Sequence, residues 1–233
     1  MSSWKKTISS WPVVGPSLKR LRASVTPKSN LVFRNSEQYW EDRYREGGNS
    51  GAGSYGRLAR FKADFLNEYV HNKGVSAVVE FGCGDGAQLA LAEYPRYTGF
   101  DVSPTVIELC RARFADNRNY EFDLVGSEAF EGFEAVDLAL SLDVIYHLIE
   151  DHVFESYMQK LFASANKSVI IYAYDFDKEY VAKHEKGRRF TSWINRRATD
   201  WRLVQVVDNR FPYDPADPEG SSQSSFFVYE RRI

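Results

Sequence analysis

The chain has 233 residues, of which 43% are hydrophobic and 15% aromatic, enough apolar material for a full core. Its two cysteines, Cys83 and Cys110, are too few for a disulfide framework and lack metal-ligand spacing, so we expect a reducing, cytoplasmic location. No apolar run has the length of a membrane span, and the start lacks the features of a signal peptide, so we take the whole chain to be mature.

The charge is distributed unevenly. Residues 1–36 carry seven lysines and arginines and no acidic residue, so the rest of the chain has a net charge of −9 against −2 for the whole. An acidic body argues against nucleic-acid binding, which depends on neutralising phosphates. We expect the basic leader to be a flexible extension; attachment to an anionic membrane or a partner protein, with a peripheral location, is the alternative.

After the leader we expect a single domain over residues 37–233. It divides into an N-terminal cap and helix (37–74), a core (75–175), and a substrate wall with closing strands (176–233). The apolar residues from Leu58 to Val70 recur at helical spacing, and Gly74 supplies the stop.

From residue 76 on, short β-rich runs alternate with helical stretches, which is typical of βαβ units on a parallel sheet. Ser103 followed by Pro104 predicts the start of one helix, and another should begin at Asp151. The pattern predicts an α/β fold: a doubly wound, mostly parallel seven-stranded sheet with helices on both faces. The predicted strands are 76–81, 97–101, 120–124, 135–142, 168–173, and a closing pair at 201–207 and 225–230.

The strongest motif is Glu80-Phe-Gly82-Cys-Gly84-Asp-Gly86, directly after an apolar run. Glycines in such a turn allow sharp bends and close approach of a ligand to the backbone. The next strand ends in Asp101, the place from which an acid accepts hydrogen bonds from a ribose diol, and the third strand contains Asp123, which could accept from an adenine amino group.

This combination resembles the class I methyltransferases that use S-adenosylmethionine (SAM) and release S-adenosylhomocysteine (SAH). The resemblance is clear over about 75–175 and looser over 39–74 and 176–233. It implies that the glycine turn lines the methionine part of SAM, that Asp101 holds the ribose, and that Val102 packs on the adenine. The cofactor-binding residues it implies are Trp40, Arg43, Gly48, Ser50, Glu80, Gly82, Cys83, Gly84, Asp101, Val102, Asp123, Leu142 and Asp143.

Two other functions fit parts of the pattern. The residues from Gly82 to Ala87 also satisfy the looser fingerprint of NAD-dependent Rossmann oxidoreductases, but Glu80 just before the glycines and the absence of a separate substrate domain argue against such an enzyme. A non-catalytic SAM-binding partner subunit is the other alternative, although such a domain usually loses the glycines or acids that this chain keeps.

The fourth strand leads into Asp143, Tyr146 and His147, at the edge where ligands of open α/β sheets bind. His147 is the expected general base, with packing against SAM as its equal alternative, and Tyr146 could orient the acceptor. His184 is the alternative base. Asp143 with Asp175 and Asp177 could hold magnesium, although we expect no metal site. Four basic residues nearby could receive an anionic acceptor: Lys183, Lys186, Arg188 and Arg189.

The residues after Asp143 lack the Asn/Asp-Pro-Pro-aromatic sequence of enzymes that methylate base amino groups, and the paired glutamates of protein-arginine methyltransferases. We therefore expect methyl transfer to a hydroxyl, less readily to an amine, of a small molecule or glycan, with no nucleic-acid partner. The segment 47–67 also resembles the region before the domain in methyltransferases associated with bacterial surface-polysaccharide synthesis.

Overall fold

The computed structural model describes residues 33–179 and 182–232. Six α-helices are formed by these residues, with short 3₁₀ turns between them. The helices are α1 (Ser36–Arg45), α2 (Gly56–Lys73), α3 (Pro104–Arg113), α4 (Glu128–Glu131), α5 (Asp151–Ala163) and α6 (Phe190–Arg197). The 3₁₀ turns are η1 (Ala52–Ser54), η2 (Leu89–Leu91) and η3 (Ile145–His147).

Seven strands form one sheet in the order β3-β2-β1-β4-β5-β9-β8. The first five run parallel, and β9 lies antiparallel between β5 and β8. A small hairpin, β6 (Lys178–Glu179) with β7 (Lys186–Gly187), stands apart from this sheet. The large sheet consists of β1 (Val78–Phe81), β2 (Tyr97–Asp101), β3 (Tyr120–Leu124), β4 (Val136–Leu142), β5 (Ala165–Ala173), β8 (Trp201–Val207) and β9 (Ser225–Arg231).

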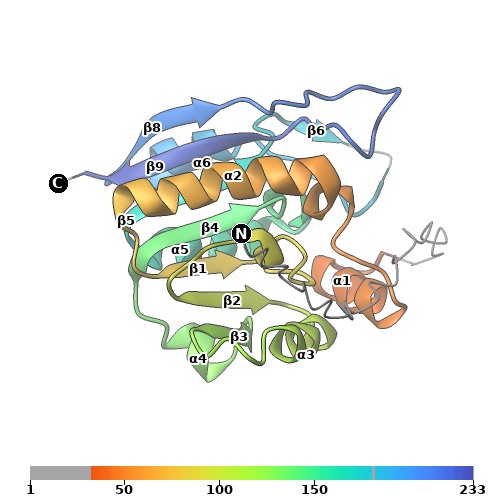
Figure 1. The fold of residues 1–233 in the computed structure, drawn as a ribbon. Coiled ribbons are helices and arrows are strands. Elements are labelled where there is room, and N and C mark those ends of the chain that lie inside the picture. The colour runs from red at the N-terminus through yellow and green to blue at the C-terminus, as the bar shows by residue number, and fades with distance from the viewer. Residues whose placement is uncertain (1–32, 180–181, 233) are drawn as a thin grey trace, which may run out of the picture.

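Helices cover both faces of the sheet, which confirms the predicted fold class. Residues of α2 and α3, among them Leu66 and Ile107, belong to the core on one face. Residues of α5 and α6, among them Met158 and Ile194, belong to the core on the other. In Figure 1 α2 crosses one face of the sheet, α5 and α6 lie behind it, and α1 stands beyond the carboxyl ends of the strands.

Local sequence explains where most of these elements begin and end. Ser103 caps α3 by accepting from the Val106 N–H, Pro104 opens the helix, and Gly74 ends α2 in the left-handed conformation. Strands β2, β3 and β8 have the predicted bounds, while β5 begins three residues early because exposed Asn166 and Lys167 hide its start in the sequence.

Two features differ from the sequence-based expectation. Helix α1 was not predicted, because its aromatic and charged residues lack a broad apolar stripe; Asn35 caps it, so it begins at Ser36, inside the predicted leader. Helix α6, within the predicted substrate wall, was not predicted either.

The rest of the leader, residues 1–32, lies outside the described residues. Within the described ranges no helix is long and apolar enough to cross a membrane.

Candidate active site

The glycine turn follows β1 and crosses to the end of β2. Gly82 and Gly84 have φ angles of +82° and +56°, a region that side chains rarely adopt. The N–H groups of Gly82 and Cys83 both donate to the Phe100 carbonyl, at 2.7 and 3.1 Å. These bonds fix the turn against β2, and Cys83 is buried beneath it.

Asp101 ends β2 directly beside this turn. One carboxylate oxygen accepts from the Gly84 N–H at 3.0 Å and the other from the Ser103 N–H at 3.1 Å. The side chain is buried, and burial raises its pKa to about 6 even though these backbone donors lower it. Val102, the next residue, remains partly exposed at the edge of the site.

Glu80 lies beneath the turn and accepts from the Tyr97 hydroxyl at 2.7 Å. Burial raises its pKa to about 7, while the Tyr97 hydrogen bond and the charge of Lys62 lower it. The glycine turn thus has two buried acids with raised pKa values on its inner side, Glu80 and Asp101. Both become easier to ionise when a cation binds near them.

The turn has the features that a SAM site needs. A Cβ built on Gly82 would lie 2.5 Å from Val144, and one built on Gly84 would lie 2.3 Å from the Ser50 hydroxyl, so only glycine fits at either position. SAM carries an ammonium, a sulfonium and a ribose diol, which match the buried acids and the bare backbone. The residues therefore fit the cofactor that the motif implies.

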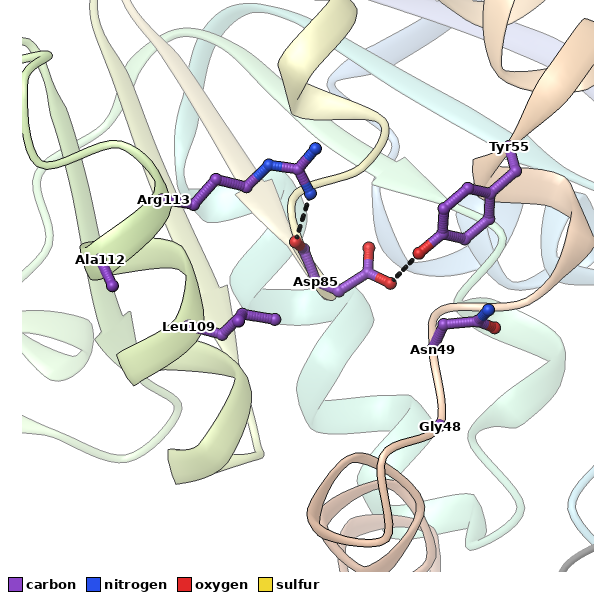
Figure 2. Close-up of a pocket in the computed structure, with 7 residues that line it drawn as sticks. All are labelled: Gly48, Asn49, Tyr55, Asp85, Leu109, Ala112 and Arg113. Carbon is purple, nitrogen blue, oxygen red and sulfur yellow. Dashed lines mark hydrogen bonds between the residues drawn. The ribbon is translucent and has the colours of Figure 1, made fainter. Parts of the chain in front are cut away.

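Residues 46–55 form a cover over the glycine turn, hereafter the cover loop. Its Ser50 N–H donates to Asp85 at 3.0 Å, and its hydroxyl accepts from the Asp85 N–H at 2.9 Å. Tyr55 at the end of the loop donates to the same carboxylate, and Tyr44 of α1 hydrogen-bonds to Ser50 at 3.0 Å. Figure 2 shows Asp85 between Tyr55 and Arg113, at a pocket of about 490 Å³. Asp85 therefore ties the cover loop to the turn.

Four of the predicted cofactor residues lie on α1 and the cover loop: Trp40, Arg43, Gly48 and Ser50. Arg43 donates through Nε to the Asn49 carbonyl at 2.7 Å, and its guanidinium carbon lies 5.4 Å from the centre of the Trp40 ring. Gly48 packs on the backbone of Arg43, where a Cβ would lie 2.7 Å from the Arg43 oxygen. Arg43 thus shapes the cover loop, and contact with a SAM carboxylate stays a prediction.

Asp123 is not brought beside Asp101. In the parallel register Asp123 pairs with Phe100, whereas Asp101 pairs with Leu124, so Asp123 points to the other face of the sheet. Its carboxylate lies 3.7 Å from Arg111 and lines a second pocket of about 250 Å³. The residue level with Asp101 is Leu124, and the contact of Asp123 with adenine stays a prediction.

Asp143 follows buried Leu142 at the end of β4 in an unusual conformation. Its φ of +59° makes it the one non-glycine residue with positive φ in the ranges 33–179 and 182–232. Its carboxylate accepts from Lys62 at 2.7 Å, from the Tyr146 hydroxyl at 3.0 Å and from the Ser224 hydroxyl at 3.2 Å. Such conformations persist only where the surroundings fix them, and they cluster at functional sites.

His147 and His184 come together beneath α1. The Nδ1 atom of His147 lies 2.9 Å from the His184 carbonyl, so Nδ1 is the protonated nitrogen and Nε2 keeps its lone pair. Trp40 packs edge-on against His147 at 4.9 Å, and Tyr39 stacks on His184 at 4.4 Å. Burial lowers the pKa of His147 to about 4, and burial also lowers that of His184.

Aromatic rings continue this wall along the carboxyl edge. The Tyr146 ring contacts His147 at 4.5 Å and stacks on Tyr174 at 4.6 Å, and Tyr174 stacks on Phe176 at 4.8 Å. We call the set Trp40, Tyr146, His147, Tyr174 and Phe176 the aromatic wall. An acceptor bound beside this wall would contact aromatic rings and not charged side chains.

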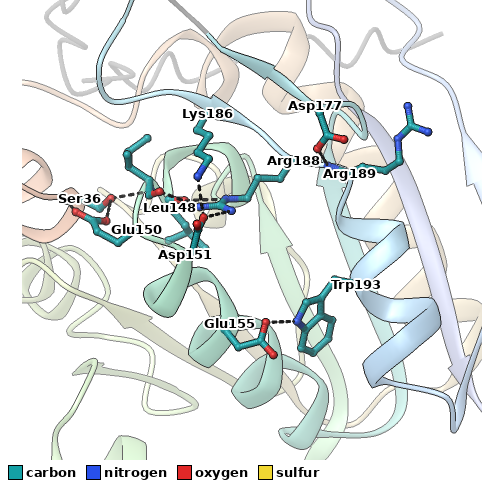
Figure 3. Close-up of polar contacts among 11 residues, drawn as sticks. Ser36, Leu148, Glu150, Asp151, Glu155, Asp177, Lys186, Arg188, Arg189 and Trp193 are labelled. Atoms are coloured by element: carbon teal, nitrogen blue, oxygen red, sulfur yellow. Dashed lines mark hydrogen bonds and ion pairs between the residues drawn. The ribbon is translucent and has the colours of Figure 1, made fainter.

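Two of the four basic residues hold the site together. Arg188 donates to the carbonyls of Leu148 and Ile149, and both Arg188 and Lys186 bind the Asp151 carboxylate. Figure 3 shows these contacts beside the pairing of Ser36 with Glu150, which ties α1 to the same loop. Lys186 and Arg188 thus brace the segment after His147, and the binding of an anionic acceptor stays a prediction.

The carboxylates considered for magnesium have other partners. Asp175 accepts from the Thr191 N–H at 3.0 Å, and Asp177 accepts from the Arg189 N–H at 2.9 Å, so both hold the start of α6. Asp143 is paired with Lys62. Within the described part of the chain no group of three His, Cys, Asp or Glu side chains is arranged to hold a metal ion.

Lys62, Tyr55 and the role of Asp85 were not predicted from the sequence. The sequence does indicate that Lys62 is buried, because it lies at helical spacing between Leu58 and Leu66 on the apolar face of α2. A lysine on such a stripe is almost never fully buried unless it is paired. Asp85 lies inside the glycine motif, but no local pattern indicates that its partners are 30 and 35 residues away.

Comparisons with known proteins point to a methyltransferase domain. Residues 79–169 match a family model described as a methyltransferase domain. EEF1A lysine methyltransferase 4 of Mus musculus is 31% identical over 93 residues, which are 38% of this chain and 35% of that protein. The chain therefore aligns with only a minor part of that relative.

Solved structures show the same fold. The N-methyltransferase NodS from Bradyrhizobium japonicum WM9, in complex with SAH, has a TM-score of 0.63 at 18% identity, over 85% of this chain and 100% of that chain. Magnesium protoporphyrin IX methyltransferase (ChlM) from Synechocystis PCC 6803, with bound SAH, has a TM-score of 0.59 at 14% identity, over 84% and 97%.

The order of the seven strands and the glycine turn after β1 are those of the class I SAM-dependent methyltransferase fold. The match to the methyltransferase-domain model covers residues 79–169, which contain the glycine turn and strands β2 to β4 of this fold.

Proposed function

We propose that the protein transfers the methyl group of SAM to a hydroxyl group of a small molecule or a glycan. The observation that carries this proposal is the position of His147. Its neutral ring, with Nε2 unprotonated, lies in the aromatic wall, three residues after Val144, which packs on Gly82 of the glycine turn. A base at that place can accept the proton that a hydroxyl loses on methylation.

SAM, when bound, supplies an electrophilic methyl group on its sulfonium. The glycine turn and Asp101 would hold the cofactor, while the aromatic wall would orient the acceptor for in-line attack. The low pKa of His147 keeps its Nε2 lone pair free at neutral pH. A base of this low pKa is weak, and it suits an acceptor whose proton leaves while the new bond to carbon forms.

An amine acceptor is the second candidate. The pKa of about 4 for His147 favours it, because a neutral amine attacks without the help of a strong base. The NodS enzyme, which has the same fold, is an N-methyltransferase.

The pH dependence of turnover separates the two acceptors. With a hydroxyl acceptor, His147 as base and SAM kept saturating at every pH, we expect kcat/KM for the acceptor to fall only below about pH 4 to 5 and to stay level from pH 6 to 8. With an amine acceptor, the rate should rise over pH 6 to 8 and follow the pKa of the acceptor itself. Tandem mass spectrometry of the product then shows whether the new methyl group is on oxygen or nitrogen.

His147→Ala and His184→Ala identify the base. If His147 is the base, His147→Ala should lower kcat about 100-fold or more, while the affinity for SAM stays within a few-fold. His184→Ala should have the smaller effect, because its main contact to His147 uses the backbone carbonyl. His71→Ala, an exposed change on α2, is the control. Equal turnover in all three variants would exclude both histidines.

A further inference from the structure

Lys62 is a buried charge that the proposed chemistry does not use directly. Its side chain is 1% exposed on the inner face of α2, where burying an unpaired ammonium would be very costly. It donates to Asp143 at 2.7 Å, and its ammonium lies 5.2 Å from the centre of the Tyr172 ring. The pair joins α2 to the carboxyl end of β4, beside the methyl-transfer site.

The backbone of Asp143 is held in a strained conformation at this point. A φ of +59° disfavours any residue with a Cβ, although aspartate tolerates it better than most. The Asp143 N–H donates to the Tyr172 carbonyl at 2.8 Å, which ties this conformation to β5. Its carboxylate thereby faces α2 on one side and Tyr146 on the other.

The cover loop passes directly over this ion pair. A Cβ built on Gly53 would lie 2.8 Å from the Asp143 carboxylate and 4.0 Å from the Lys62 ammonium. The pair is therefore closed off from above by the loop that also covers the glycine turn. The contacts run from Lys62 through Asp143 to the Tyr146 hydroxyl, and the Tyr146 ring then contacts His147.

We propose that Lys62 is a positioning residue of the acceptor site: its ammonium holds the Asp143 carboxylate in the orientation that accepts from the Tyr146 hydroxyl and so fixes the Tyr146 ring against His147. This inference rests on the proposed function, because the aromatic wall is taken as the acceptor site. Lys62 touches neither Tyr146 nor His147 through any described hydrogen bond, so it acts through Asp143. A change at Lys62 should therefore alter turnover more than SAM binding.

The test compares Lys62→Met, Lys62→Arg and the double variant Lys62→Met/Asp143→Asn. Lys62→Met removes the charge at similar length, Lys62→Arg keeps it, and the double variant leaves no unpaired buried charge. Lys73→Met is the matched control, because Lys73 lies on the same helix and forms an exposed ion pair with Glu230. Each variant is first checked for folding by circular dichroism and thermal unfolding.

Three quantities are then measured: SAH affinity by calorimetry, and kcat and acceptor KM with methyl-labelled SAM and fractionated cell extract. For Lys62→Met we expect SAH affinity within about threefold of the wild type and a fall in kcat of about 100-fold, the scale of loss for a misplaced acceptor. Lys62→Arg should recover part of kcat. The double variant should regain stability without regaining turnover, and Lys73→Met should behave as the wild type.

A stable double variant with wild-type kcat would overturn the proposal, because the pair would then be only structural. Equal losses of SAH affinity and kcat in Lys62→Met would overturn it as well. A double-mutant cycle of Lys62→Met and Tyr146→Phe, measured by equilibrium unfolding, tests the contact without any measurement of turnover. We expect the combined effect on the unfolding equilibrium constant to differ about tenfold from the product of the two single effects. If the wild type transfers no methyl group while this coupling is present, the proposed function fails and the positioning contact stands.

Discussion

Replacing Asp101 with alanine is expected to abolish SAM binding. A carboxylate that accepts from both ribose hydroxyls makes charge-assisted hydrogen bonds of about 1.5–3 kcal/mol each, so the loss should be at least about 100-fold in affinity. The change also leaves the Gly84 N–H without its acceptor, which costs about 1–3 kcal/mol of stability. Calorimetric titration with SAH measures the affinity, and thermal unfolding verifies the fold.

Asp116→Ala is the matched control, since Asp116 is exposed in the turn after α3 and should leave SAH binding unchanged. A folded Asp101→Ala protein with undiminished affinity would contradict the assignment of the ribose site to the end of β2.

The raised pKa of Asp101 adds a pH dependence to the same experiment. Its folded pKa of about 6 lies above the ordinary value, so the side chain is ionised at pH 7 and largely protonated at pH 5. A protonated carboxyl accepts hydrogen bonds poorly, so the affinity of the wild type for SAH should fall as the pH drops through 6. The Asp101→Asn variant should bind SAH weakly, and its affinity for SAH should no longer change as the pH passes through 6.

Gly84→Val should also abolish SAM binding, for a different reason. Its φ of +56° costs a residue with a Cβ about 1–2 kcal/mol. The new Cβ would lie 2.3 Å from the Ser50 hydroxyl and 3.3 Å from the Tyr44 hydroxyl, so the cover loop must move away from the turn. SAH titration should show no binding.

Gly74→Val separates strain from site geometry. Gly74 has a φ of +58°, nearly that of Gly84, but a Cβ there would meet nothing within 4 Å, and the residue lies at the far end of α2. The two variants should lose comparable stability from backbone strain, while only Gly84→Val loses binding. Tight SAH binding by Gly84→Val would mean that the cofactor does not approach this backbone.

Local patterns were enough to predict the parallel sheet and the glycine turn. The alternation of β-rich runs with helical stretches, the Ser103-Pro104 start and the Gly74 stop are all encoded within a few residues. The closing strands β8 and β9 could also be predicted, because each consists of a continuous run of residues that favour strands.

The site residues that the sequence did not reveal depend on long-range packing. Lys62 meets Asp143 across 81 positions, and Ser50 meets Asp85 across 35, so no local spacing predicts either contact. The role given to Asp123 followed from its position near the end of a strand, and only the register shows that Leu124 is level with Asp101. The sequence indicated that Lys186 and Arg188 belong to a basic surface for the acceptor, but in the structure they bind Asp151 and nearby carbonyls.

The most direct test is transfer of a labelled methyl group from SAM into fractionated cell extract by the purified full-length chain. We predict label in the glycan and lipid-linked pool or in the low-mass soluble pool, dependent on the protein and lost with Asp101→Ala. The pool that takes the label also distinguishes a glycan acceptor from a small metabolite. No transfer into any fraction by a folded protein that binds SAH would contradict a catalytic methyltransferase and favour a non-catalytic SAM-binding subunit.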